Sequence, residues 1–181
     1  NVRLNQKILE LDGVEAIFIH PHMGDGGITI GSALDVTAKE QGLLPEAIAD
    51  AYWGNATTDQ VIEQTLAEYP VQFEKLGDPS EAIADCLVQK QVLGLFNGRM
   101  EYGPRALGHR TIMAEPTDPT MMEWLNKRLE RTEFMPFAPI ILEEDAPQYF
   151  ENFDAGRLPA RFMTICFNVT EYGKKMAPGI V

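Results

Sequence analysis

The sequence predicts a mixed fold of class α/β (α+β), in which short strands are accompanied by amphipathic helices. Apolar runs at 92–96 and 140–142 have the length of buried strands and are bounded by turn-forming residues. The Asp-Pro pairs at 78–79 and 118–119 are typical helix starts, because aspartate caps a first turn and proline tolerates the first helical position. We therefore expect a sheet with helices packed against it.

Three elements are predicted before residue 43. Apolar residues at helical spacing predict a helix over 2–10, which an Asp-Gly pair ends. The apolar run at 14–20 predicts a buried strand. A helix rich in small residues is expected from about Ile28 to Glu40, with Gly42 ending it.

The stretch from 43 to 70 is predicted to connect two units. Pro45 and the Gly54-Asn55 pair are breakers. Tyr52 and Trp53 are predicted to pack against other parts of the protein rather than to stack on a ligand, because aromatic side chains mostly serve packing. One face of a linking helix consists of Val61, Ile62, Leu66 and Tyr69.

Beyond residue 70 the pattern predicts alternating strands and helices. The expected helices run from about 80 to 90, from about 119 past 129, and up to about 150, and residues 156–161 are expected to form a mobile loop. The expected strands are 71–75, 92–96, 111–114, 140–142 and 162–167.

Composition limits the classes of function. The formal net charge of −12 over 181 residues argues against nucleic acid and against an anionic membrane surface as partners. No stretch approaches the roughly 20 apolar residues of a membrane span. Cys86 and Cys166 are too few for a disulfide framework or a zinc site and are expected to be small buried residues in a reducing compartment. We expect a cytoplasmic enzyme or part of one.

The stretch 97–110, called the arginine loop below, concentrates positive charge in this acidic chain. It reads NGRMEYGPRALGHR, with Arg99, Arg105 and Arg110 among three glycines and a proline. Glycine lets backbone amides approach a ligand, and the guanidinium group offers a planar set of donors that matches phosphate or carboxylate. The loop is therefore a candidate anion site in which the guanidinium groups share one cavity. The alternative is a surface turn whose arginines pair with acidic side chains.

The stretch 20–27, called the glycine turn below, reads HPHMGDGG and precedes the small-residue helix. A strand, a glycine-rich turn and a helix can present backbone amides and a helix N-terminus to phosphate. Asp25 could bind a metal ion. Equally, it could form the turn and cap the helix.

These two stretches, together with FMPFAP at 134–139, resemble the NodU/CmcH family of carbamoyltransferases, and they occur in the order typical of that family. The resemblance implies that 1–45 is the C-terminal piece of an actin-like ATPase domain, that 46–70 is a linker with a helix, and that 71–181 is a truncated YrdC-like domain with a twisted mixed sheet. It also implies that the chain is an internal fragment, inactive by itself.

The activity implied by the resemblance is O-carbamoyl transfer. Carbamoyl phosphate and ATP give carbamoyl-adenylate and pyrophosphate, and the carbamoyl group then passes to a hydroxyl of a small molecule such as a sugar or an antibiotic. A divalent metal ion, iron or magnesium, assists the second step. The matching residues are Arg99, Arg105 and Arg110 as catalytic groups, Gly98, Glu101, Lys127 and Arg131 as further contacts to carbamoyl phosphate or adenylate, Gly24, Gly26 and Gly27 near the nucleotide, and Asp25 on the metal.

Two positions depart from the family pattern. Met135 and Glu130 stand where basic residues are common in the family. Glu101 and His109 are expected to orient guanidinium groups rather than to exchange protons. Two alternative functions remain, a threonylcarbamoyl-adenylate type of enzyme and a module that binds nucleotides or anions without catalysis.

Overall fold

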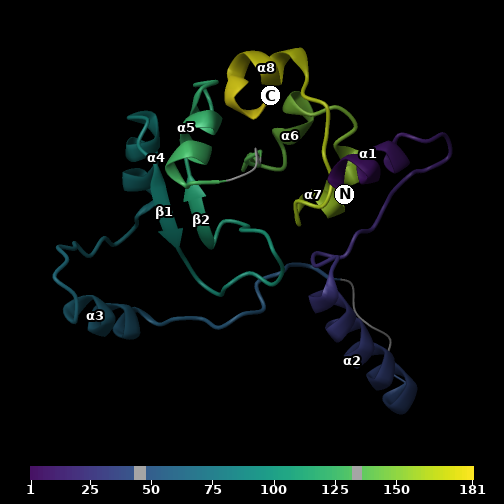
Figure 1. The fold of residues 1–181 in the computed structure, drawn as a ribbon, viewed down its shortest axis with the longest axis horizontal. Coiled ribbons are helices and arrows are strands. Elements are labelled where there is room, and N and C mark those ends of the chain that lie inside the picture. The colour runs from purple at the N-terminus through teal and green to yellow at the C-terminus, as the bar shows by residue number, and fades with distance from the viewer. Residues whose placement is uncertain (43–47, 132–135) are drawn as a thin grey trace.

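Short helices and one antiparallel pair of strands make up the computed structural model, which describes residues 1–42, 48–131 and 136–181 (Figure 1). Pro45, Phe134 and Met135 lie outside these residues, as does the domain boundary predicted at 45–46. The elements are α1 (Val2–Leu9), α2 (Asp25–Gln41), α3 (Asp59–Ala67), α4 (Ser80–Val88), β1 (Leu93–Phe96), β2 (Arg110–Met113), α5 (Met121–Arg128), α6 (Ala146–Tyr149), η1 (Asp154–Gly156), α7 (Arg157–Ala160), α8 (Glu171–Met176) and η2 (Pro178–Ile180).

The sheet confirms two of the predicted strands. β1 and β2 pair antiparallel, with Leu93 opposite Met113 and Phe96 opposite Arg110. The connection between these strands is the arginine loop. The helices predicted on either side also form, and the carboxylates of Asp78 and Asp118 accept from the backbone N–H two residues on, at 2.9 Å in both cases. The mixture of helices and strands agrees with the α/β class that the sequence predicts.

The sheet is smaller than predicted, since the described residues form two strands and no mixed sheet. The stretches 14–20, 71–75, 140–142 and 162–167 are not strands, because no neighbouring strand in the described part of the chain pairs with them. Ile140 and Leu142 are 65% and 64% exposed. At 162–167 the extended path is broken by Met163, which has a φ of 54°. Residues 156–161 are also unlike the prediction, because they include helix α7 instead of a loop.

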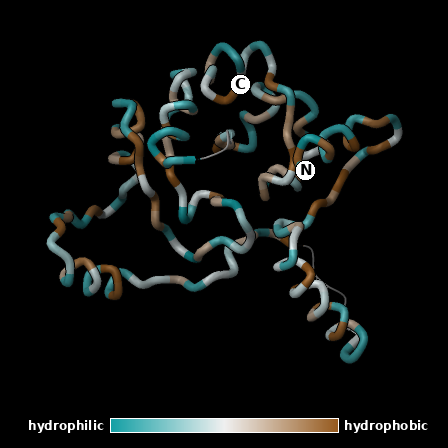
Figure 2. Tube along the Cα trace, viewed as in Figure 1, coloured by the Kyte–Doolittle hydropathy of each residue, from teal (hydrophilic) through white to brown (hydrophobic). Residues whose placement is uncertain are grey.

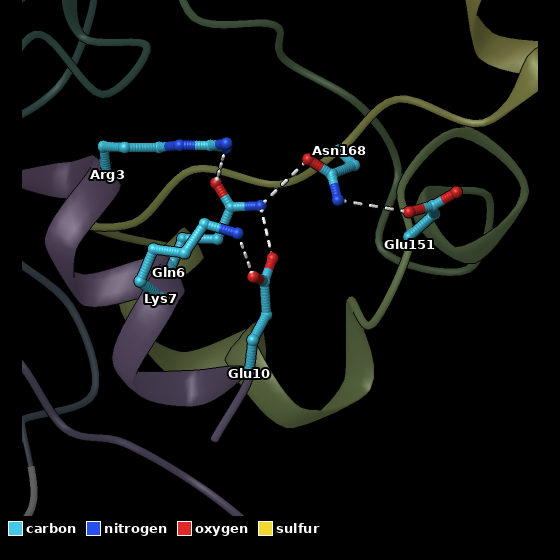
Figure 3. Close-up of polar contacts among 6 residues, drawn as sticks. All are labelled: Arg3, Gln6, Lys7, Glu10, Glu151 and Asn168. Carbon is cyan, nitrogen blue, oxygen red and sulfur yellow. Dashed lines mark hydrogen bonds and ion pairs between the residues drawn. The ribbon is translucent and has the colours of Figure 1, made fainter. Parts of the chain in front are cut away.

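The C-terminal helices and α1 share the best-buried part of the chain. Phe162, Ile165 and Ala146 are buried there, together with Leu9 from α1. Polar contacts fix the same interface, as Figure 3 shows: Gln6 is 3% exposed, and its amide nitrogen donates to Asn168 Oδ1 at 3.1 Å. A buried amide stabilises this docking only because its partners are present. The first ten residues are thereby held against the last forty.

Helix α2 projects away from the rest of the structure (Figure 1). It ends where predicted, because Gly42 has a φ of 66° and closes the helix in the left-handed conformation. None of its residues is buried, and hydrophobic residues lie along it far from the C-terminal helices (Figure 2). No helix formed by the described residues is long and apolar enough to cross a bilayer.

Candidate functional site around the arginine loop

The arginine loop leaves the sheet as an ordered connection. The backbone N–H of Asn97 donates to the carbonyl of His109 at 2.9 Å and so extends the β1–β2 ladder by one step. Gly98, Gly103 and Gly108 have φ values of 45°, 103° and 96°, which side-chain-bearing residues adopt only with strain. The glycines that suggested close approach to a ligand therefore also have a local role, since they let the chain turn.

Glu101 organises this loop from inside. Its side chain is buried, with 9% exposed, and its Oε1 accepts from the backbone N–H of Leu107, His109 and Arg110 at 2.8, 2.8 and 3.0 Å. Burial alone would raise the pKa of Glu101, but these backbone donors outweigh it and lower the pKa to about 2. We expected Glu101 to orient a guanidinium group. It binds backbone amides instead and holds the loop closed over residues 101–110.

Arg99 and Arg110 are held by backbone carbonyls. Arg99 donates from Nε to the carbonyl of Gly54 at 2.9 Å and from a terminal nitrogen to that of Trp53 at 3.0 Å. Arg110 donates to the carbonyl of Asn97 at 2.6 Å, and its guanidinium carbon lies 3.5 Å from the centre of the Phe96 ring, its partner across the strands. Much of the donor capacity of both groups is used within the protein. The alternative of arginines paired with acidic side chains is not what these contacts show.

Arg105 differs from its two neighbours. It is exposed, and no hydrogen bond or ion pair between described residues involves its guanidinium group. It follows Pro104 and lies between Glu101 and Leu107, whose backbone N–H Glu101 binds. Among the three arginines predicted to be catalytic, Arg105 is thus the one whose donors are open to an external anion.

The segment 51–56, which the sequence predicts to be part of a connector, packs against the arginine loop. The Tyr52 ring stacks on the His109 ring, with centroids 3.8 Å apart, and its hydroxyl donates to the carbonyl of Leu107 at 2.8 Å. His109 Nδ1 lies 2.6 Å from the carbonyl of Arg99, so this nitrogen carries the proton and donates. The prediction that Tyr52 and Trp53 pack against protein is confirmed. The contacts themselves could not be foreseen, because they join residues about fifty positions apart.

Tyr102 brings the glycine turn to the arginine loop. Its ring stacks on Trp53 with centroids 4.8 Å apart, and its hydroxyl donates to the carbonyl of Gly26 at 3.1 Å. In Figure 1 the loop extends from the sheet to the start of α2. Two stretches that the sequence singled out separately are therefore in direct contact.

Two of the three glycines of the turn leave no room for a side chain. A Cβ atom at Gly26 would lie 2.5 Å from His22 Nε2, and one at Gly27 would lie 2.0 Å from the carbonyl oxygen of His22. Gly24 has more room, since a Cβ there would be 3.5 Å from the nearest atom of His22. The role of the three glycines beside a nucleotide stays a prediction, and close contacts with His22 explain Gly26 and Gly27 independently.

Alanine at Gly27 should destabilise the glycine turn by about 1–3 kcal/mol, because backbone atoms must shift to admit the methyl group. The matched control is Gly31→Ala in the same helix, where a Cβ meets nothing within 4 Å and a gain of up to about 1 kcal/mol is expected. Thermal unfolding and amide exchange of residues 20–30 measure both. Equal behaviour of the two variants would contradict the close packing of the turn.

A comparison with protein families decides the identity of the C-terminal half. The model of the family described as "Carbamoyltransferase C-terminus" matches residues 84–181. The chain belongs to this carbamoyltransferase family. The arginine loop and helix α5 both lie within the matched residues.

Individual relatives agree with the NodU-like assignment. The chain is 34% identical to nodulation protein NolNO of Sinorhizobium fredii over 94% of its own length and 26% of the relative. It is 35% identical to nodulation protein NolO of Bradyrhizobium diazoefficiens, over 94% of this chain and 32% of the relative. Nodulation protein U of Rhizobium tropici is 32% identical, over 83% and 25% of the two chains. The chain thus spans between a quarter and a third of these relatives, and the resemblance to NodU-like carbamoyltransferases is confirmed.

Other predicted site residues of this carbamoyltransferase chain lie apart from the arginine loop. Lys127 is exposed in the last turn of α5, where the helix dipole favours a cation. The Arg131 guanidinium carbon lies 4.5 Å from the centre of the Phe137 ring. No hydrogen bond, ion pair or ring contact between described residues joins either side chain to the loop. Their contact with carbamoyl phosphate stays a prediction.

The described residues do not form a complete metal site. Asp25 is exposed in the first turn of α2, and the backbone N–H of His22 donates to His20 Nδ1 at 3.1 Å. No three His, Cys, Asp or Glu side chains in the described ranges come together as a set of ligands. Asp25 is at most one ligand among others.

A surface cavity of about 420 Å³ lies elsewhere, between the segment 16–18 and helix α7. Its lining includes Phe18, Leu158 and Arg161, and none of the predicted site residues. It therefore does not serve as the shared cavity that we expected between the guanidinium groups.

Proposed function

We propose that this carbamoyltransferase-family chain is part of an ATP-dependent O-carbamoyltransferase. The observation that carries the proposal is the arginine loop, in which the buried Glu101 fixes the backbone and leaves Arg105 exposed, within the residues that match the carbamoyltransferase family. An exposed guanidinium group on a fixed backbone is suited to phosphate, because the backbone places it at the loop and its donors need not leave a protein partner when the ligand binds.

The proposed reaction has two steps. Carbamoyl phosphate, ATP and water give carbamoyl-adenylate, pyrophosphate and phosphate. The carbamoyl carbon is then attacked by a hydroxyl of a small-molecule acceptor, such as a sugar or an antibiotic, and AMP leaves. A divalent metal ion, iron or magnesium, would supply charge stabilisation in the second step, and Asp25 is the residue in this chain that would help to hold it.

The roles of the described residues follow from their contacts. Arg105 binds the phosphate of the substrate and offsets charge that develops as phosphate leaves. Arg99 and Arg110 hold the loop through backbone carbonyls and contribute positive potential to the same region. Gly98, with its φ of 45°, permits the turn that brings Arg99 back to Gly54.

Pyrophosphate release tests this proposal in the complete polypeptide encoded by the gene. We expect release that depends on carbamoyl phosphate and that does not change when threonine is added. Mass spectrometry should then detect one added carbamoyl group on a hydroxyl acceptor. Release that needs threonine would instead favour the threonylcarbamoyl-adenylate alternative.

A second candidate function is anion or nucleotide binding without catalysis. It is favoured by one observation, that Arg99 and Arg110 already have backbone partners. Calorimetry with carbamoyl phosphate separates the two functions when it is combined with the pyrophosphate measurement. Binding without any pyrophosphate release would support the second candidate.

A further inference from the structure

Tyr102 joins the arginine loop to two segments that are distant in the sequence, the glycine turn and residues 51–53. Besides its stack on Trp53 and its bond to Gly26, its backbone N–H donates to the carbonyl of Ala51 at 2.6 Å. The ring centroids of His20 and His22 lie 5.9 and 5.5 Å from the centroid of the Tyr102 ring. One side chain of the arginine loop therefore contacts both ends of the glycine turn.

The backbone next to Tyr102 is equally close to the turn. A Cβ atom at Gly103 would lie 3.2 Å from the carbonyl oxygen of Pro21, so the two segments meet without a gap. The Tyr102 hydroxyl is protonated as the donor to Gly26, and burial raises its pKa above the ordinary value of 10.0. Close-packed segments of this kind transmit displacements, because neither can move without the other.

We propose that Tyr102 is a positioning residue that couples the arginine loop to the glycine turn, so that an anion bound by the loop also orders the first turn of α2. This inference rests on the proposed function, since it takes carbamoyl phosphate as the ligand of the loop. The coupling is reciprocal: a ligand that orders the glycine turn strengthens binding at the loop by the same factor. Ligand binding at one of two sites that act in sequence on one carbamoyl group would thereby favour ligand binding at the other.

Amide hydrogen exchange of the complete polypeptide, with and without carbamoyl phosphate, tests the coupling. In the wild type we expect slower exchange both at 104–112 and at 20–30, the latter by about fivefold, at the lower end of typical coupling between sites. Tyr102→Phe removes the bond to Gly26 and retains a ring that can stack on Trp53. It should lose the slowing at 20–30 and keep the slowing at 104–112.

Tyr52→Phe is the matched control. It also removes one tyrosine hydroxyl from one backbone carbonyl, that of Leu107, but this bond does not involve the glycine turn. We expect the response at 20–30 to persist in this variant. A structural defect that is common to lost hydroxyl groups would affect both variants equally, and that result would overturn the role of Tyr102.

Two further results would overturn the inference and can be told apart. Slowing at 104–112 alone in the wild type would disprove the coupling and leave the proposed function intact. If neither segment exchanged more slowly, both the coupling and the proposed function would be disproved, because carbamoyl phosphate would then not bind the loop. The wild-type measurement can disprove the coupling by itself, even where a variant folds poorly.

Discussion

Replacing Arg105 with alanine in the complete polypeptide should lower kcat/KM for carbamoyl phosphate by about 100-fold, the lower end of the loss that follows removal of one donor to developing charge. The side chain is exposed and has no hydrogen bond or ion pair within the described part of the chain. Its removal should therefore leave the melting temperature unchanged. Steady-state kinetics and thermal unfolding of the same preparation measure both effects.

The neighbouring arginines provide the contrast. Arg99→Ala should reduce activity and also lower stability, because the carbonyls of Trp53 and Gly54 lose their donors. Arg161→Ala is the control for lost surface charge, since this half-exposed side chain pairs with Glu143 and with no other acidic side chain in the described ranges, and such pairs contribute about 0–1 kcal/mol. If Arg105→Ala retained full activity, or if it melted at a lower temperature, the assignment of Arg105 as the open phosphate contact would be wrong.

The sequence was sufficient to place the two strands and the loop between them, although not their antiparallel pairing. The apolar run at 92–96 and the strand at 111–114 appear at their predicted positions, and the arginines, glycines and proline between them marked the loop as distinctive. Local signals also located the starts of α4 and α5 and the end of α2 at Gly42. These features depend on residues a few positions apart, so the pattern of a single stretch determines them.

The contacts that build the site depend on distant residues and were not predictable in this way. Nothing local distinguishes a glutamate that accepts backbone amides six to nine residues ahead from one that pairs with an arginine. The stack of Tyr52 on His109 likewise requires the chain to return across about fifty residues. The apolar run at 140–142 was wrongly predicted to be a strand for the same reason. A strand needs a neighbouring strand to pair with, and the local pattern does not show whether one is present.

Replacing Glu101 with glutamine should reduce the protection of the Leu107, His109 and Arg110 amides about 100-fold at pH 7. The pKa of Glu101 lies at about 2 against an ordinary value of 4.5, and each unit of difference corresponds to about 1.4 kcal/mol. The ionised carboxylate thus contributes about 3 kcal/mol to the closed loop. A carboxamide retains one acceptor oxygen, but its NH2 group replaces Oε2, which also accepts from the Arg110 N–H at 3.2 Å, and cannot accept.

The dependence on pH has a definite sign. Because the pKa of Glu101 is lowered on folding, its contribution is complete at pH values above the ordinary 4.5 and is lost as the pH falls toward 2. At pH 3 the protection factors of these amides, corrected for intrinsic exchange, should be about 30-fold below their values at pH 7. Glu101→Gln should remove most of this change, whereas Glu171→Gln, whose side chain is 90% exposed, should not.

Protection in the wild type that stays constant from pH 7 to pH 3 would mean that the loop is held by its glycines and aromatic contacts and not by the carboxylate. Arg105 would then lack the fixed support from which its proposed role follows.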